Sequence, residues 1–295
     1  MRRIVDMQIT LALLCMACGG GTGRLDVAVS GEEAATSGYP VAPSTADEIR
    51  FADGWTMEID QIVVSLSQFE LRGAGGADAA LESDAILVAL HGGDASAWTF
   101  EGVPARRWED VRYRIAPPDA GARDAGPVDP STRAQMIASG WSIYLEARAA
   151  KGSVTRTLRW GLPLTVDNRH CVSEDGTDGT IVAPGERSEA QVTIHLDHFF
   201  FDDLRLDEAQ MRFDAIAAAA DPSGVVSFDA LSAQRLADLR GLDGMPLADD
   251  QGAPVVYDPG SAALSEPTLR AMVLEAASTI GHWNGEGHCE YVVAR

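Results

Sequence analysis

Histidine side chains offer the clearest sign of chemistry in this sequence of 295 residues. Five of the six histidines lie after residue 169, and imidazole, which is neutral near pH 7, is the commonest protein ligand for zinc and copper. Neither His-Glu-x-x-His nor paired Cys-x-x-Cys motifs occur, so a metal site would need ligands from separate segments. The alternative is that these histidines only pack and form hydrogen bonds. The candidate ligands are His170, His195, His198, His282 and His288.

Two cysteines suggest how separate segments could meet. Cys171 and Cys289 each follow a histidine directly, and in an exported chain they are expected to form a disulfide. The bond would close a loop of 289 − 171 = 118 residues, which is worth about 4 to 5 kcal/mol in the chain-entropy model. Bridged cysteines have Cα atoms about 5.5 Å apart, so the imidazoles of His170 and His288 should lie within about 6 to 13 Å of each other. The sequence therefore predicts a metal site built on these two histidines.

The remaining candidate ligands lie in two short motifs. On an extended strand, His195 and Asp197 would share a face and His198 would point the opposite way, unless the chain turns at the run of three phenylalanines that follows. His282 precedes a glycine-rich turn in which Glu286 offers a carboxylate. Any of these three histidines could join the pair beside the predicted disulfide.

A calcium site is a weaker alternative. Residues 207–219, a loop containing Gly224 and a second helix starting near residue 228 resemble an EF-hand helix-loop-helix. Gly224 at the sixth loop position would place Ala219 first and Ala230 twelfth, where calcium loops carry carboxylates. We therefore do not expect calcium binding, and the weak alternative site would use Asp221 and Asp229.

The motifs of common enzymes and nucleic-acid-binding proteins are missing from the sequence. There is no Gly-x-Ser-x-Gly elbow or Ser-x-x-Lys, and the two downstream cysteines are better explained as a disulfide than as nucleophiles. We therefore expect no catalytic residues, with a hydrolase using the His-Leu-Asp-His segment as the alternative. A net charge of −21 and the lack of a basic stripe argue against nucleic acid as a partner.

The N-terminal segment predicts export and anchoring. Residues 1–17 combine two arginines with an apolar stretch too short to span a bilayer, as in a cleaved signal peptide. Cys18 would then be lipidated and become the new N-terminus. Residues 18–48 are rich in small and polar residues and predict a flexible tether. We expect a protein anchored by lipid in the cell envelope, at the outer membrane, on its periplasmic or its surface face.

The elements that must position the histidines read mainly as strands. Residues 55–66 alternate between apolar and polar, residues 85–90 form a continuous apolar run, and residues 190–197 alternate strictly. Helical patterns follow over about 207–219, 229–240 and 265–280. The predicted fold is a single mainly β domain over residues 49–295, an antiparallel β-sandwich with a helical C-terminal section over about 207–282.

Three segments also carry a resemblance to known proteins. They are residues 195–200, the EF-hand-like stretch and the closing residues 281–289. Over about the last 130 residues the chain resembles exported lipoproteins of Gram-negative bacteria, and more distantly it is similar to the MbnP-type periplasmic copper-binding family. The resemblance implies a β-sandwich that binds copper and works beside a di-haem protein. The predicted function is binding of a transition metal, with copper favoured over zinc, through a histidine cluster near the Cys171–Cys289 disulfide. The alternative is a structural or partner-binding lipoprotein without metal and without catalysis.

Overall fold

The structure is a computed structural model that describes residues 21–41, 49–74, 77–205 and 209–294. The predicted signal peptide (1–17) and the predicted lipidation site Cys18 lie outside the described residues. No helix among the described residues is long and apolar enough to cross a bilayer.

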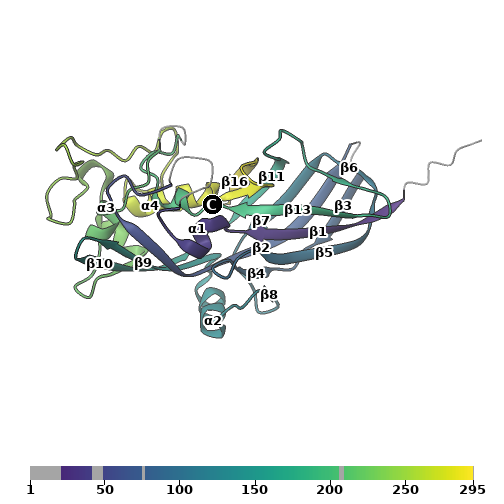
Figure 1. Cartoon of the computed structure of the whole chain (residues 1–295), viewed down its shortest axis with the longest axis horizontal. Coiled ribbons are helices and arrows are strands. Elements are labelled where there is room, and N and C mark those ends of the chain that lie inside the picture. Colours follow the sequence, from purple (N-terminus) through teal and green to yellow (C-terminus); the bar gives the residue numbers. More distant parts are fainter. Residues whose placement is uncertain (1–20, 42–48, 75–76, 206–208, 295) are drawn as a thin grey trace, which may run out of the picture.

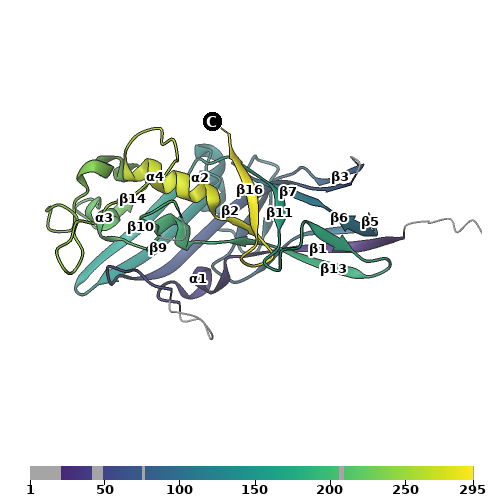
Figure 2. The ribbon, with the colours of Figure 1, turned by 90° about the horizontal axis from the view of Figure 1, so that it is seen from above.

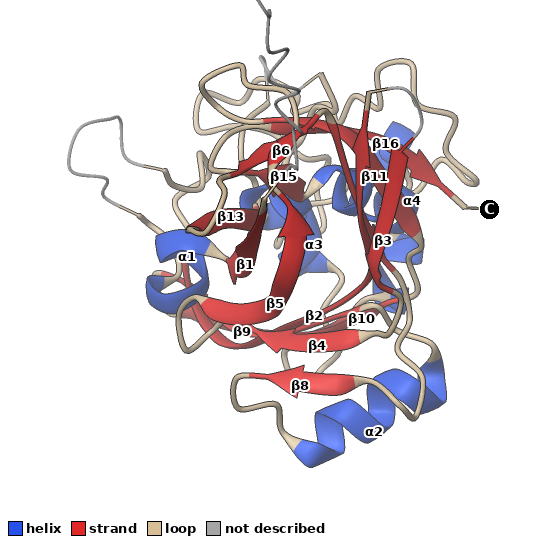
Figure 3. Cartoon of the chain, turned by 90° about the vertical axis from the view of Figure 1, so that its right-hand side faces the viewer, coloured by secondary structure: helices blue, strands red, loops and turns tan. Residues whose placement is uncertain are grey.

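Two β-sheets make up most of the molecule, which confirms the predicted mainly β, sandwich-like fold. The smaller sheet has four strands in the order β15–β13–β1–β5, and the larger sheet has ten. Figure 3 shows the larger sheet running along the bottom and right side of the molecule, with β1, β5 and β13 of the smaller sheet facing it. The strands of the smaller sheet are β1 (Thr22–Ser30), β5 (Ala95–Pro104), β13 (Arg187–Ile194) and β15 (Gly281–Trp283).

The larger sheet follows the path β14–β10–β9–β2–β7–β11–β16, with β3 and β4 paired to the long strand β2 and β8 paired to β4. Most neighbours are antiparallel, as predicted, but the pairs β1–β13, β4–β8 and β10–β14 are parallel. Its strands are β2 (Thr56–Gly73), β3 (Ala77–Glu82), β4 (Ile86–Ala89), β7 (Asp110–Ile115), β8 (Arg123–Ala125), β9 (Ile143–Lys151), β10 (Val154–Leu162), β11 (Val166–Val172), β14 (Val225–Ser227) and β16 (His288–Val293). A separate two-stranded sheet pairs β6 (Arg106–Trp108) with β12 (Thr180–Val182).

Helices are short and lie between or beside the strands. Figure 2 shows α4 and the neighbouring loops at one end of the molecule, and β1, β5 and β13 reaching toward the other end. The α-helices are α1 (Glu32–Ser37), α2 (Pro130–Ser139), α3 (Asp214–Ala218) and α4 (Leu269–Ala276). The 3₁₀ turns are η1 (Asp197–Phe200), η3 (Asp229–Ala233), η4 (Leu236–Asp238) and η5 (Ala277–Thr279).

The predicted tether is wrong for the part that the structure describes, because β1 is an inner strand of the smaller sheet. It pairs in parallel with β13 on one side and antiparallel with β5 on the other (Figure 1). Leu25, Val27 and Val29 are each at most 1% exposed. The folded domain therefore begins at about residue 22 instead of residue 49. Residues 18–20 and 42–48 of the predicted tether lie outside the described residues.

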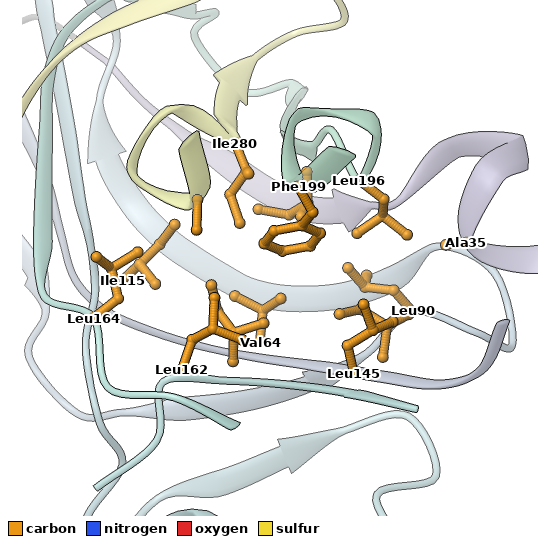
Figure 4. Close-up of a cluster of buried hydrophobic side chains, with 14 of the residues drawn as sticks. Ala35, Val64, Leu90, Ile115, Leu145, Leu162, Leu164, Leu196, Phe199 and Ile280 are labelled. Carbon is orange, nitrogen blue, oxygen red and sulfur yellow. The ribbon is translucent and has the colours of Figure 1, made fainter. Parts of the chain in front are cut away.

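The hydrophobic core lies between the two sheets and continues under η1 and α4. Figure 4 shows Val64, Leu145 and Leu162 of the larger sheet facing Phe199 and Ile280 across this core. All of these side chains are at most 1% exposed. The segment after β13 is thus anchored by apolar packing as well as by hydrogen bonds, which fixes the backbone on which the histidine motif lies.

The C-terminal section contains less helix than the sequence predicted, and it contains no EF-hand in the described residues. In the described part of the first expected helix, residues 209–219, the α-helix is limited to α3, and the helix expected over 229–240 is replaced by the turns η3 and η4. The loop with Gly224 leads into β14, which pairs with β10 of the larger sheet. Only the pattern over 265–280 forms the expected helix, as α4 followed by η5.

The weak calcium alternative at Asp221 and Asp229 is also corrected, because both carboxylates have partners in the structure. One carboxylate oxygen of Asp221 accepts hydrogen bonds from the backbone N–H groups of Ser223 and Val225, within its own turn. The Asp229 carboxylate forms an ion pair of 3.1 Å with Arg270. Each carboxylate already has a partner, and among the described residues neither belongs to a group of closely spaced metal-ligating side chains.

The predicted disulfide is confirmed. Cys171 of β11 and Cys289 of β16 are bonded at 2.00 Å between their Sγ atoms, with Cα atoms 4.0 Å apart. The two strands are antiparallel neighbours at the end of the larger sheet. The bond therefore closes the C-terminal strand onto the sheet.

Candidate metal centre

Three of the five candidate histidines come together in the structure. The ring centroids of His195 and His282 are 4.1 Å apart, and the ring of His198 lies 5.7 Å from that of His195 and 5.3 Å from that of His282. His195 and His198 are buried, and His282 is half-buried. A cluster of imidazoles therefore exists, although it is not the one beside the disulfide.

Strand pairing brings His195 and His282 together. In the antiparallel pair β13–β15, Thr193 lies opposite His282, and the N–H of His195 donates to the carbonyl of Ile280 at 2.9 Å. Thr193 and His195 are two residues apart and so project from the same face of the sheet. His195 is thus the diagonal neighbour of His282, close enough for the rings to make contact.

A turn brings His198 to the same place. The chain leaves the extended conformation after His195 and forms η1 from Asp197. Leu196 and Phe199 point from this turn into the core (Figure 4), and the ring of His198 lies beside that of His195. The sequence left open whether the chain would continue as a strand or turn before the three phenylalanines. The structure shows that it turns.

Three carboxylates surround the histidines. An oxygen of Glu32 lies 3.8 Å from Nδ1 of His195, and an oxygen of Glu286 lies 3.9 Å from Nε2 of the same ring. Glu32 reaches this position because β1 runs parallel to β13 with Ser30 opposite Thr193, so that two residues later the chain lies beside His195. Asp197 is the third carboxylate and begins η1.

Hydrogen bonds hold the loop that carries Glu286. Asn284 accepts from the N–H of Gln191 at 2.8 Å, and the N–H of Gly285 donates to the hydroxyl of Thr193 at 3.2 Å. Gly285 has a φ of 82°, in the left-handed region that favours glycine. The loop between β15 and β16 is therefore fixed to β13, the strand that leads to His195.

The donors form two groups whose ligand atoms lie within 4.8 Å of one another. One group contains His195, His282 and Glu286, and the other contains His195, Asp197 and His198. In the first group, the buried atoms His195 Nε2 and His282 Nδ1 have no hydrogen-bond partner among the described residues. Buried polar atoms are nearly always paired, so two unpaired ring nitrogens in one cluster call for an explanation.

The tautomer of His198 follows from its neighbour Thr279. The hydroxyl of Thr279 donates to the carbonyl of Ala276 at 2.9 Å, and its oxygen lies 2.7 Å from Nδ1 of His198. Because the single hydroxyl proton is already used, Nδ1 of His198 must be the donor. Nε2 of His198 then carries a lone pair, which is the state required of a metal ligand.

Burial keeps two of the imidazoles neutral. Desolvation, together with the charges of His282 and His195, lowers the pKa of His198 to about 3. Desolvation and the charge of His195 lower the pKa of His282 to about 4. Desolvation also raises the pKa values of Glu32 and Asp197 above their usual range. Neutral imidazoles are the metal-binding form, so these rings do not need to lose a proton near neutral pH.

We expect His282→Gln to flatten the pH dependence of stability in metal-free protein. Between the ordinary histidine value of 6.5 and about 4, the unfolded chain binds a proton at residue 282 and the folded chain does not. The free energy of unfolding of the parent protein therefore falls as the pH falls, by up to about 1.4 kcal/mol per pH unit for this ring. The raised pKa values of Glu32 and Asp197 act in the opposite direction, but they act in both proteins.

Urea unfolding at several pH values from 7 to 4, with a chelator present, measures this difference. The free energy of unfolding of the parent should fall more steeply with falling pH than that of His282→Gln. Parallel curves would show that His282 is not kept neutral by the fold.

His170 and His288 do not belong to the cluster, which corrects the prediction that the disulfide organises the metal site. Both side chains are exposed, and Nδ1 of His170 lies 3.4 Å from the carboxylate of Asp110. The reason in β11 is a break in the regular strand, because its pairing with β16 shifts register between Arg169 and Val172 and His170 has a φ of 50°. Beyond this irregularity Cys171 is fully buried, whereas His170 is exposed. The His-Cys dipeptides thus place sulfur inside and imidazole outside.

Sequence reasoning also missed one ligand-type residue. Glu32 lies in the segment that was predicted to be a tether, and no local motif links it to residues 195–198. Asp197 and Glu286 were recognised as nearby carboxylates from their own motifs. Comparison of the chain with protein-family models, with curated proteins and with solved structures gave no match.

Proposed function

We propose that the protein binds a divalent transition-metal ion through His195, His282 and Glu286. The observation that carries this proposal is the pair of buried ring nitrogens, His195 Nε2 and His282 Nδ1, that have no hydrogen-bond partner among the described residues. A buried polar atom left unpaired costs about 1 to 3 kcal/mol. A metal ion between these nitrogens and the carboxylate of Glu286 would satisfy both.

The donor types favour zinc or copper in the divalent state. Imidazole and carboxylate suit Zn²⁺ and Cu²⁺, whereas the sulfur ligands that select Cu⁺ are not part of either group of donors. Three protein ligands leave a coordination position for water or for an external ligand. The choice of copper over zinc, and of a di-haem protein as partner, rests on the resemblance to the MbnP-type family alone.

Export and lipid anchoring at Cys18 remain part of the proposal. They are supported by the signal-like pattern of residues 1–17 and by the disulfide, since disulfides persist in oxidising compartments. β1 begins at Thr22, four residues after Cys18. Four residues span at most about 14 Å, so an anchored domain would lie directly at the membrane surface.

Competition with a chromophoric chelator tests the proposed site. We expect His195→Gln and His282→Gln to weaken zinc binding by about 100-fold or more, because even the loss of an outer-shell partner of a metal ligand costs 10- to 100-fold. The matched controls are His170→Gln and His288→Gln, which remove exposed imidazoles outside the cluster. Near-UV circular dichroism would establish that each variant is folded.

Two results would contradict the proposal. One is a folded parent protein that binds neither zinc nor copper, in which case the structural or partner-binding alternative gains support. The other is an equal loss of affinity in the control variants, which would place the metal at the exposed histidines.

A further inference from the structure

The cluster contains more donors than one ion requires. The cluster contains three imidazoles, that of His195 included, and three carboxylates, and the two groups of donors share only His195. A zinc or copper ion with three protein ligands uses only the first group. The second group, with Asp197 and His198, would then have no function in the proposed site.

His195 presents a carboxylate to each of its ring nitrogens. Glu286 lies 3.9 Å from Nε2, and Glu32 lies 3.8 Å from Nδ1. Both distances are too long for a hydrogen bond, and they fit two ligands that approach a common ion. The two nitrogens of an imidazole point in divergent directions, so an ion at Nε2 leaves Nδ1 available to another ion.

The state of His198 is suited to the second position. Its Nδ1 is committed to Thr279 at 2.7 Å, so Nε2 is the nitrogen left to ligate. A hydrogen bond from one ring nitrogen to a fixed acceptor is the usual support of a metal-ligating histidine. His198 is 5% exposed, and its ring lies 5.7 Å from that of His195.

On the basis of the proposed function, we propose that the cluster holds a second divalent transition-metal ion. Its ligands are His198, Asp197 and the second ring nitrogen of His195, and Glu32 lies beside it. His195 then bridges the two ions as an imidazolate, and its ring proton is released to solvent when the second ion binds. The charges balance, because three carboxylates and one imidazolate match two divalent cations. The ions would lie about 6 Å apart, given metal–nitrogen bonds of about 2.0 Å on each side of the ring.

The stoichiometry of zinc binding tests this proposal separately from the proposed function. Isothermal titration of the full domain with Zn²⁺, and elemental analysis after desalting, should give two equivalents. The double variant Asp197→Asn/His198→Gln should retain one equivalent. A count of one in the parent protein overturns the second ion and leaves the proposed function intact, whereas a count of zero overturns both.

A control variant tests whether zinc binds at the exposed histidines, and a spectroscopic measurement tests whether His195 bridges the two ions. The double variant His170→Gln/His288→Gln should still bind two equivalents, and loss of the second equivalent in this variant overturns the proposal. In protein loaded with two Cu²⁺, coupling across the imidazolate should reduce the electron paramagnetic resonance signal below that expected for the copper present. A full signal from two independent ions would also overturn it.

Discussion

A chain that begins at residue 49 is expected not to fold, although residue 49 is where the sequence predicted the domain to start. Such a chain lacks β1, which lies between β13 and β5 in the smaller sheet. Without it, β5 loses its partner in that sheet, and β13 keeps only the three-residue strand β15. The smaller sheet would lose an inner strand. The backbone that carries His195 would then lose most of its strand pairing.

The energy of burial supports this expectation. Leu25, Val27 and Val29 are each almost completely buried. Burying one such side chain contributes about 1.5 to 3 kcal/mol, so the three together contribute roughly 5 to 9 kcal/mol. That is similar to the entire stability of a typical domain, about 5 to 15 kcal/mol.

Circular dichroism and urea unfolding of two chains check this prediction. The chain starting at residue 49 should show no cooperative transition, and the chain starting at residue 21 should unfold cooperatively. A cooperative transition of similar midpoint in both chains would mean that β1 is not needed for folding, as the tether prediction implied.

The second large effect is expected from removal of the disulfide. Cys171→Ala/Cys289→Ala should lower the free energy of unfolding by about 4 to 5 kcal/mol, because the bond closes a loop of 118 residues. The same change should alter zinc affinity by less than about tenfold, since the Glu286 loop is held to β13 by its own hydrogen bonds.

Urea unfolding of the parent and of the double variant measures the first effect, and chelator competition measures the second. Chemical reduction of the disulfide in the parent protein is an independent way to obtain the protein without this bond. A loss of zinc binding in a folded double variant would restore the disulfide as the organiser of the metal site. A change in stability below about 1 kcal/mol would contradict the entropic account.

The fold class could be predicted because strong strand patterns occur in both sheets. The apolar run at 85–90 and the alternation at 190–197 are long enough to indicate strands whatever the flanking residues are. β1 was missed because its alternating segment, Leu25 to Val29, lies between stretches rich in glycine, alanine and serine. The average composition of residues 18–48 concealed the short alternating pattern of β1, a strand that pairs on both sides with strands distant in the sequence.

The candidate site was predicted in part. The sequence identified the residue types and the segments that carry His195, His198 and His282. It could not determine which of the five histidines would meet, because their contacts depend on the register of β13 with β15 and on the turn η1. The disulfide between Cys171 and Cys289 was predicted correctly, but the histidines beside it were not the ones that cluster, because a disulfide constrains Cα positions and not the direction of the neighbouring side chains.

Anomalous diffraction from crystals of the zinc-loaded protein would test the proposed metal centre most directly. We predict a peak at the zinc edge about 2.0 to 2.1 Å from Nε2 of His195 and from Nδ1 of His282, within reach of the carboxylate of Glu286. The absence of a peak at this position, or peaks only beside His170 or His288, would contradict the account.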